Sequence, residues 1–336
     1  MNEISTNIQG GRKAALLTGL AAALTAGNLQ AQAAPAAQDS PAQMVDALHA
    51  AFGKHHARAV HSKGIMLEGS FVPASEARTI TKAPLFTAAK MPVLLRFSDF
   101  TGLPDIPDTA GGANPRGLAL RFKAEGGDMD VVTHSFNGFP TATAAEFAQL
   151  LRAIGASGPQ TAKPTALEKF LGSHPIARTF LSTQKPAPVS YATLAYYGVN
   201  AFRFVDAAGR AVFVRYRFIP VAGEQFLDAS ALGAKGPNYL LEEIPARVAK
   251  GPIAYEWFAQ VSASGDAIAD PSVAWPESRK LVNLGTIRIE RLVADQATLD
   301  KSTMFLPTSV PSGIEPADPM LAIRSGAYPI SFGERQ

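Results

Sequence analysis

The chain contains no cysteine among its 336 residues. This absence excludes disulfide bonds, zinc sites with thiolate ligands, iron–sulfur clusters and a cysteine nucleophile. Excess positive charge is also scarce, because the formal net charge is only +3 and no block of lysine and arginine stands out. A nucleic-acid-binding function therefore has little electrostatic support.

The composition is that of a folded protein. Hydrophobic residues make up 47% of the chain and charged residues 18%, a balance that is typical of globular proteins and not of disordered ones. This length permits either one large domain or two small ones. All-β barrels of this size commonly form one domain, so we expect a single domain.

The first residues have the pattern of a secretory signal peptide. Arg12-Lys13 precedes an apolar run from Ala14 to Ala26, and a polar stretch then leads to Ala31-Gln32-Ala33. A basic start, a short apolar run and an A-x-A end are the parts of such a peptide. The run is too short to span a membrane. An N-terminal amphipathic helix is the alternative, but the run shows no polar face.

This pattern predicts the organisation of the whole chain. We expect a signal peptide at residues 1–33, an Ala/Pro/Gln-rich linker at residues 34–40 and one folded domain at residues 41–336. The mature protein would then be periplasmic or secreted, with no membrane contact beyond the signal peptide.

Alternating apolar and polar residues predict about eight strands with few long helices between them. Strands are expected near residues 64–72, 93–98, 118–122, 130–133, 200–205, 211–219, 254–262 and 281–292, and helices near residues 41–53, 144–156, 164–183 and 237–250. Runs of strands argue against alternating β-α units. The predicted fold class is therefore α+β, with a closed eight-stranded antiparallel barrel and helices packed outside it. The tail, residues 307–336, has little periodicity and is expected to be irregular.

Four short motifs contain residues with chemical potential. They are R-A-V-H-S-K-G at residues 58–64, R-F-S at 96–98, N-P-R-G at 114–117 and R-S-G-A-Y-P at 324–329. Each alone has an ordinary explanation, since a lone histidine such as His61 is more often structural than catalytic. Arg324 and Tyr328 could likewise be an exposed pair four residues apart on a helix.

In this order, the four motifs together resemble those of the haem catalases, and most closely the shorter catalase-related peroxidases. The similarity runs from about Arg58 to Arg335. It implies a catalase-like core, a haem b cofactor, hydrogen peroxide or an organic hydroperoxide as substrate, and a small-molecule electron donor. A homodimer is one possible assembly. Without cysteine, the haem iron needs His, Met or Tyr as its axial ligand.

The resemblance also implies a role for each matched residue. His61 matches the distal acid–base residue, Tyr328 the axial ligand of the iron, and Arg324 the arginine beside that ligand. The remaining matches are Arg58, Arg96 and Arg335 to arginines that pair with haem propionates, Val60 and Phe147 to residues along the ring, and Ser98 to a serine that bonds the distal histidine.

Physical chemistry agrees with these roles. A free phenol ionises near pH 10, and a cation such as Arg324 beside it favours the phenolate form. On the other face of the haem, His61 would take a proton from peroxide and return it to the leaving oxygen. Arginine suits the propionates because its guanidinium pairs with carboxylates in a forked geometry.

The match fails at the distal asparagine of full catalases. That asparagine follows an Asp-Leu-Val run, whereas this chain reads D-V-V-T-H-S-F-N-G-F-P from Asp130. Ungapped alignment places Ser135 at the asparagine, and Asn137 lies two residues on, on the same face of a strand. We expect Asn137 in this role, with Ser135 as the alternative. His134 is a weaker candidate because it would point to the opposite face.

The chain also lacks the long N-terminal arm and the large C-terminal regions of full catalases. This difference predicts an open haem pocket, and hence peroxidase turnover with weak or no dismutation of peroxide. Two alternatives remain open. One is a hydroperoxide-rearranging enzyme like the allene oxide synthases, which share this core. The other is a non-catalytic periplasmic barrel that only binds haem.

Overall fold

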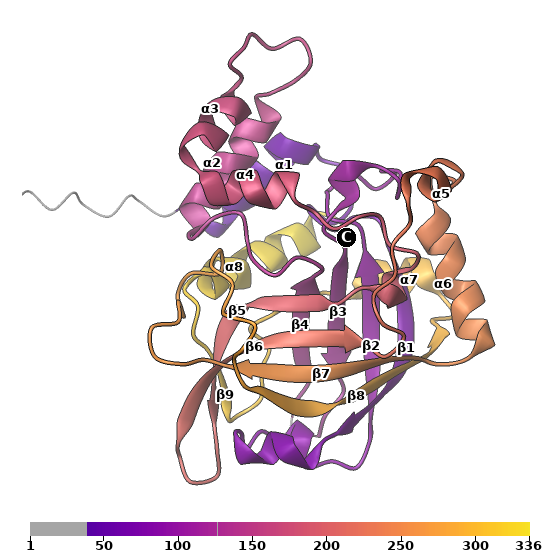
Figure 1. Ribbon diagram of the computed structural model, residues 1–336, viewed down its shortest axis with the longest axis vertical. Helices are drawn as coiled ribbons and strands as arrows, with labels where there is room; N and C mark the ends of the chain where they lie inside the picture. Colours follow the sequence, from indigo (N-terminus) through magenta and orange to yellow (C-terminus); the bar gives the residue numbers. More distant parts are fainter. Residues whose placement is uncertain (1–38, 126) are drawn as a thin grey trace, which may run out of the picture. The chain divides into compact units, whose positions relative to one another are not determined.

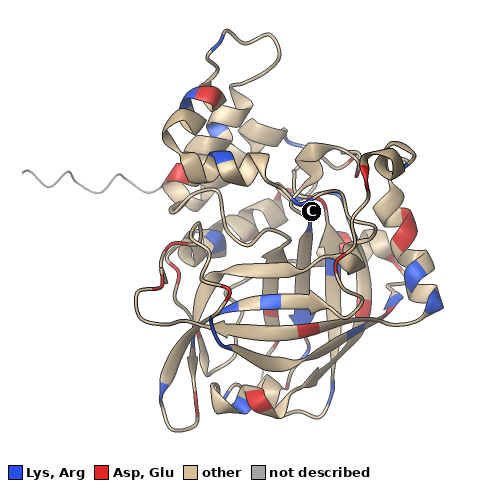
Figure 2. Cartoon of the chain, viewed as in Figure 1, with Lys and Arg blue, Asp and Glu red and all other residues tan. Residues whose placement is uncertain are grey.

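The computed structural model describes residues 39–125 and 127–336. The predicted signal peptide and all but the last two residues of the predicted linker lie outside these ranges. Within these ranges, no helix combines the length and the apolar character that crossing a membrane requires. Figure 2 shows lysine and arginine interspersed with aspartate and glutamate over the visible face.

The barrel predicted from the alternating segments is confirmed (Figure 1). Its strands are β1 (Gly64–Pro73), β2 (Met91–Ser98), β3 (Gly117–Phe122), β4 (Met129–His134), β5 (Tyr196–Val205), β6 (Ala211–Pro220), β7 (Ile253–Val261) and β8 (Leu281–Leu292). They pair in the order β4-β3-β2-β1-β8-β7-β6-β5, all antiparallel, and β4 pairs with β5 to close the barrel. A short strand, β9 (Ile314–Pro316), adds to β5.

The barrel interior is filled with aromatic side chains. Trp257 is fully buried, and its ring lies 4.8 Å from that of Phe122 and 5.5 Å from those of Phe71 and Phe218, measured between ring centroids. Offset and edge-on packing at these distances is favourable. The interior is therefore a hydrophobic core, and a ligand site has to lie outside the barrel wall.

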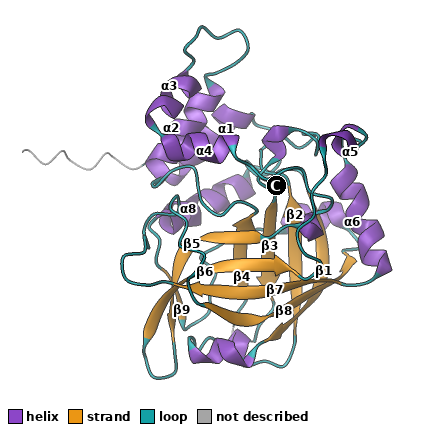
Figure 3. Cartoon of the chain, viewed as in Figure 1, coloured by secondary structure: helices purple, strands orange, loops and turns teal. Residues whose placement is uncertain are grey.

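The helices lie outside the barrel (Figure 3). They are α1 (Pro41–Phe52), α2 (Ala144–Gly155), α3 (Ala166–Ser173), α4 (Pro175–Ser182), α5 (Ala229–Gly233), α6 (Tyr239–Lys250), α7 (Gln296–Ser302) and α8 (Met320–Gly333), with 3-10 turns η1 (Ser75–Thr79), η2 (Pro84–Phe86), η3 (Gly111–Ala113) and η4 (Tyr191–Thr193). The first helix begins where predicted, because Ser40 and Gln43 form a reciprocal capping box.

Helices α1, α2 and α8 share a second hydrophobic core. Their apolar faces bury Val45, Leu48, Ala148, Leu151 and Ala327 against one another. This core positions the C-terminal helix, and it corrects the expectation of an irregular tail: residues 320–333 are helical although Pro329 lies inside the helix.

Candidate active site

A large cavity lies between the outer wall of the barrel and the second core. It holds about 1410 Å³ of empty space, counted with its solvent-filled mouth, which is ample for a cofactor-sized ligand. Nine of the ten predicted site residues line it. They are Arg58, Val60, His61, Arg96, Ser98, Phe147, Arg324, Tyr328 and Arg335.

One row of residues across four strands forms part of the cavity wall. Ser98 on β2 pairs with Gly117 on β3, Gly117 pairs with His134 on β4, and His134 pairs with Tyr197 on β5. All four line the cavity. Directly opposed residues of an antiparallel sheet lie about 4.5–5.5 Å apart and share a face, so the strand pairing itself brings these side chains together.

His61 lies over the gap that Gly117 leaves in this row. A Cβ atom at Gly117 would lie only 2.6 Å from Nδ1 of His61, so a side chain here would displace the imidazole. The backbone of His61 is left-handed, with φ of +58°, a conformation that costs free energy for a residue with a side chain. Its N–H donates to the carbonyl of Phe100 at 2.9 Å, which holds this conformation in place.

The hydrogen bonds of His61 fix its tautomer. Nδ1 lies 3.0 Å from the carbonyl oxygen of Asp99 and 3.1 Å from Oγ of Ser98. A carbonyl oxygen only accepts, so Nδ1 carries the proton and Nε2 keeps its lone pair. Burial, together with the charges of His134 and Arg96, lowers the pKa of His61 to about 3. The ring is therefore neutral at pH 7, with Nε2 able to act as a base.

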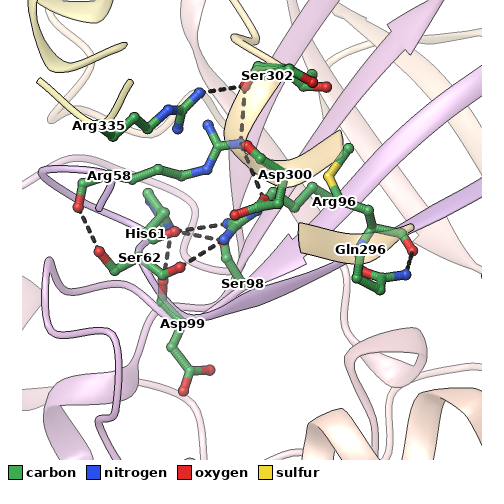
Figure 4. A network of polar contacts seen from close by, with 12 residues as sticks. Arg58, His61, Ser62, Arg96, Ser98, Asp99, Gln296, Asp300, Ser302 and Arg335 are labelled. Carbon is green, nitrogen blue, oxygen red and sulfur yellow. Dashed lines mark hydrogen bonds and ion pairs between the residues drawn. The ribbon is translucent and has the colours of Figure 1, made fainter. Parts of the chain in front are cut away.

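Arg96 holds the segment that carries His61 (Figure 4). Its guanidinium donates to the carbonyl of His61 and to that of Ser62, both at 2.7 Å, and its Nε donates to Asp300 at 2.5 Å. Three of its five donors are thus used within the protein. In this structure Arg96 positions the segment of His61 and Ser62, and fewer donors remain for a propionate than the resemblance implies.

Arg58 and Arg335 keep donors without partners. Arg335 is buried and Arg58 is half-buried, and the Nε atom of each is itself buried with no hydrogen-bond partner among the described residues. Burial lowers the pKa of Arg58 to about 9 and that of Arg335 to about 10. Burial alone would raise the pKa of Asp300, but Arg96 and Arg58 lower it overall. The cluster therefore has three arginines and only one carboxylate, which pairs with Arg58 and Arg96, so it can accept further anionic groups.

A chain of polar contacts holds Tyr328 in place. Tyr328 Oη accepts a hydrogen bond from Arg324, whose guanidinium also lies over the phenol ring, 5.2 Å from its centroid. Arg324 donates to Oδ1 of Asn200 at 2.7 Å, and Asn200 donates to Asp318 at 2.8 Å. Because a bulge interrupts β5 between Gly198 and Phe202, Asn200 leaves the regular ladder and meets α8.

These features fit a haem. The cavity wall between the polar groups is apolar, with Val60, Val132, Phe139 and Phe147 among its residues, as a porphyrin face requires. The unpaired Nε atoms described above could bind its carboxylates. The phenol oxygen of Tyr328 is a suitable iron ligand, and it lines the same cavity.

The structure does not bring Asn137 to the cavity. Strand β4 ends at His134, and Asn137 lies in the following turn, where its amide donates to Glu277 at 3.2 Å. Ser135 faces away from the cavity, since its Oγ accepts from the backbone N–H of Arg116. The expectation that Asn137 or Ser135 lines the cavity is therefore wrong. The residue of this segment that faces the cavity is His134.

The sequence analysis missed three residues of the site. His134 was assigned to the wrong face of its strand, although its neighbour Val132 shares the cavity face two residues earlier. Asn200 and Asp300 gave no signal, because each lies far in sequence from the arginine that it contacts. The three predicted arginines implied that a carboxylate lay near them, but they did not identify Asp300.

Comparison with known proteins agrees with this geometry. The sequence profile of the catalase family matches residues 36–335. A catalase-related peroxidase of Mycolicibacterium paratuberculosis is 34% identical, covering 87% of this chain and 93% of its own. Another, of Synechococcus elongatus, is 32% identical, covering 88% of both chains.

Full catalases are more distant. The catalase of Rattus norvegicus is 28% identical, and the match covers 83% of this chain but 56% of that protein. A fungal catalase structure superimposes with a TM-score of 0.72 at 19% identity, covering 83% of this chain and 59% of the other. The chain thus spans little more than half the length of these catalases. The profile match and the identity to these relatives show that the chain belongs to the catalase family.

Proposed function

We propose that the chain is a haem peroxidase that reduces hydrogen peroxide or organic hydroperoxides with electrons from a small-molecule donor. As a member of the catalase family it is an oxidoreductase that acts on peroxide. The proposal adds haem b as the form of the cofactor, Tyr328 as the axial ligand of its iron and His61 as the residue that moves the proton.

One observation supports these roles above all others. A single apolar cavity is lined both by an imidazole with a bare Nε2 and by a phenol that accepts a hydrogen bond from an arginine. The first group suits proton abstraction from peroxide, and the second suits an anionic iron ligand. A barrel that only stored haem would have no use for a histidine held in a strained conformation, and this argues against the binding-only alternative.

The protein side of the reaction follows from the geometry. Arg58 and Arg335 would hold the haem carboxylates, and Arg324 would favour the phenolate form of Tyr328. His61 would accept the proton of peroxide at Nε2 and deliver it to the departing oxygen, which leaves as water or an alcohol. Haem held by these residues would supply the redox chemistry of the O–O cleavage, and the small-molecule donor would provide the two electrons that are consumed.

Peroxidase turnover is proposed over dismutation because the relatives that the chain matches along most of their length are named catalase-related peroxidases. The electron donor, a homodimeric assembly and export to the periplasm or beyond stay predictions from the sequence.

Two substitutions in the haem-loaded protein test the proposal. In Tyr328→Phe the phenol oxygen is lost, so we expect a changed Soret band and weaker haem binding. In His61→Ala we expect the Soret band to persist while the rate of reaction with peroxide falls by about 100-fold or more, the usual contribution of a general acid–base group. Absorption spectra and stopped-flow mixing with hydrogen peroxide measure both effects.

The control is His174→Ala, which removes a histidine that stacks on Phe170 outside the cavity. It should leave both the spectrum and the rate unchanged. A colourless protein after haem supply, or a Tyr328→Phe variant with unchanged iron coordination, would refute the proposed function. Oxygen release at a rate rivalling full catalases would refute the preference for peroxidase turnover.

A further inference from the structure

His134 and His61 are neighbours across the sheet. Gly117 lies directly opposite His134, and the imidazole of His61 occupies the space where a Gly117 side chain would be. The two side chains are therefore neighbours along this row of the sheet, and both line the same cavity. The charge of His134 also contributes to lowering the pKa of His61, which requires the two rings to be close.

Among the described residues, the side chain of His134 has one hydrogen bond, and this bond fixes its tautomer. The backbone N–H of Phe136 donates to Nδ1 of His134 at 3.3 Å, so Nδ1 carries the lone pair. Burial lowers the pKa of His134 to about 3, and the ring is neutral at pH 7. In a neutral ring with Nδ1 unprotonated, the proton must lie on Nε2. His134 is thus a donor at the nitrogen where His61 is an acceptor.

This donor has no partner in the protein. His134 is 8% exposed, and among the described residues nothing accepts a hydrogen bond from its Nε2. Native proteins rarely leave a buried polar atom unpaired, so such an atom calls for an explanation. An oxygen atom of a ligand in the cavity that His134 lines would provide the missing acceptor.

Aromatic side chains hold the His134 ring in this orientation. Phe180 meets it edge-on, with centroids 6.2 Å apart and planes at 88°, and Phe139 lies 6.4 Å away. Phe100 packs edge-on against His61 at 5.4 Å and also contacts Phe180. The two imidazoles thus share one aromatic wall, which limits rotation of either ring.

We propose that His134 is a second catalytic residue, whose Nε2–H donates a hydrogen bond to peroxide while Nε2 of His61 accepts the peroxide proton. The inference rests on the proposed function and deepens it. A hydroperoxide has one O–H to donate and oxygen lone pairs that accept. One acceptor and one donor side by side match this pattern, and they select the protonated form of peroxide over its anion. His134 exchanges no proton in this scheme, because it only orients and polarises the oxygen.

The tautomers can be tested without haem. In apoprotein with ¹⁵N-labelled histidine, long-range ¹H–¹⁵N spectra distinguish a protonated Nε2 from a protonated Nδ1, and His134→Gln assigns the signal. We expect His134 protonated on Nε2 and His61 protonated on Nδ1 at pH 7. A His134 ring protonated on Nδ1, or on both nitrogens, would overturn the inference.

The donor itself is tested in the haem-loaded protein with fluoride as the probe, since iron-bound fluoride accepts hydrogen bonds. His134→Phe keeps an aromatic ring but removes the donor, and fluoride affinity should fall about tenfold or more. His134→Gln places an amide N–H at a similar reach and should restore most of the affinity. His174→Phe is the matched control and should bind fluoride as the unsubstituted protein does.

The peroxide reaction should follow the same order, with His134→Phe slowed about tenfold or more and His134→Gln close to the unsubstituted protein. Equal fluoride affinity and equal peroxide rates in His134→Phe, with the Soret band intact, would refute the role of His134 and leave the proposed function standing. Failure of the unsubstituted protein to bind haem would refute both. If His134→Phe does not fold, the tautomer spectra and His134→Gln still decide, because a slow His134→Gln variant would contradict donation.

Discussion

Gly117 decides where His61 can lie. A Cβ atom at this position would meet Oγ of Ser98 at 2.5 Å and Nδ1 of His61 at 2.6 Å. Both are closer than real Cβ contacts, and both partners are fixed by hydrogen bonds to each other. Because Gly117 has no side chain, the imidazole of His61 can lie against the sheet. It then lies next to His134, which is opposite Gly117 on β4.

We therefore expect Gly117→Ala to displace His61 while leaving Tyr328, the proposed haem ligand, in place. The Soret band should persist, the peroxide rate should fall toward that of His61→Ala, and overpacking should cost about 1–3 kcal/mol of stability. Stopped-flow kinetics and denaturant unfolding measure these effects. Gly111→Ala is the control, because a Cβ there meets nothing within 4 Å. A fast Gly117→Ala enzyme would contradict this account.

At the scale of elements, the strands could be predicted because alternation is a local property of the sequence. Each of the eight predicted strands is present, with ends that differ by at most a few residues. The helix at residues 41–52 was also predictable, since its cap and its apolar spacing are both local. Side-chain roles at the ends of elements were harder, as Asn137 shows, because the end of β4 depends on its pairing with β3.

The C-terminal helix could not be predicted from local signals. Its Gly326 and Pro329 are poor helix formers, and its stability comes from packing against α1, which lies far away in sequence. Similarly, Asn200 reaches Arg324 only because β5 bulges at a point set by its pairing with β6. Tertiary contacts of this kind leave no periodic pattern in the chain.

Gly326 allows α8 to approach α1. A Cβ atom at this position would lie 2.4 Å from Cγ of Pro41, so Gly326→Ala should push α8, and Tyr328 with it, away from its place. We expect a loss of about 1–3 kcal/mol in the free energy of unfolding, despite the better helix propensity of alanine, and weaker haem binding in titrations of the apoprotein.

Gly333→Ala serves as the control in the same helix, because a Cβ there meets nothing within 4 Å. It should be neutral or stabilising by up to about 1 kcal/mol. Haem affinity unchanged in Gly326→Ala would mean that the contact between α1 and α8 does not position the phenol.

For the whole molecule, two buried neutral histidines make stability depend on pH. The pKa of His61 and that of His134 are each lowered to about 3 by burial, whereas an unfolded histidine titrates near 6.5. Below pH 6.5 the unfolded apoprotein therefore binds protons that the folded protein excludes. Stability should fall as pH falls from about 6.5 toward 3, by about 1.4 kcal/mol per pH unit for each histidine.

Asp99 acts in the opposite direction, because burial raises its pKa to about 6. Comparing variants removes this contribution. Between pH 6 and pH 5, the apoprotein of His134→Gln should lose stability less steeply than the unsubstituted apoprotein, by about 1.4 kcal/mol per pH unit. Urea unfolding at several pH values measures the slopes, and parallel slopes would show that His134 is not neutral and buried.

The filled barrel interior gives this protein a built-in optical reporter. The chain has two tryptophans; Trp257 is sealed at the barrel centre, while Trp275 lies under the guanidinium of Arg215, 4.5 Å from its ring centroid. Emission from Trp257 should stay blue-shifted as long as the barrel is intact, whether or not the outer cavity is occupied. In the apoprotein, the wavelength of emission can then follow barrel unfolding, whereas the Soret band follows haem binding in the loaded protein.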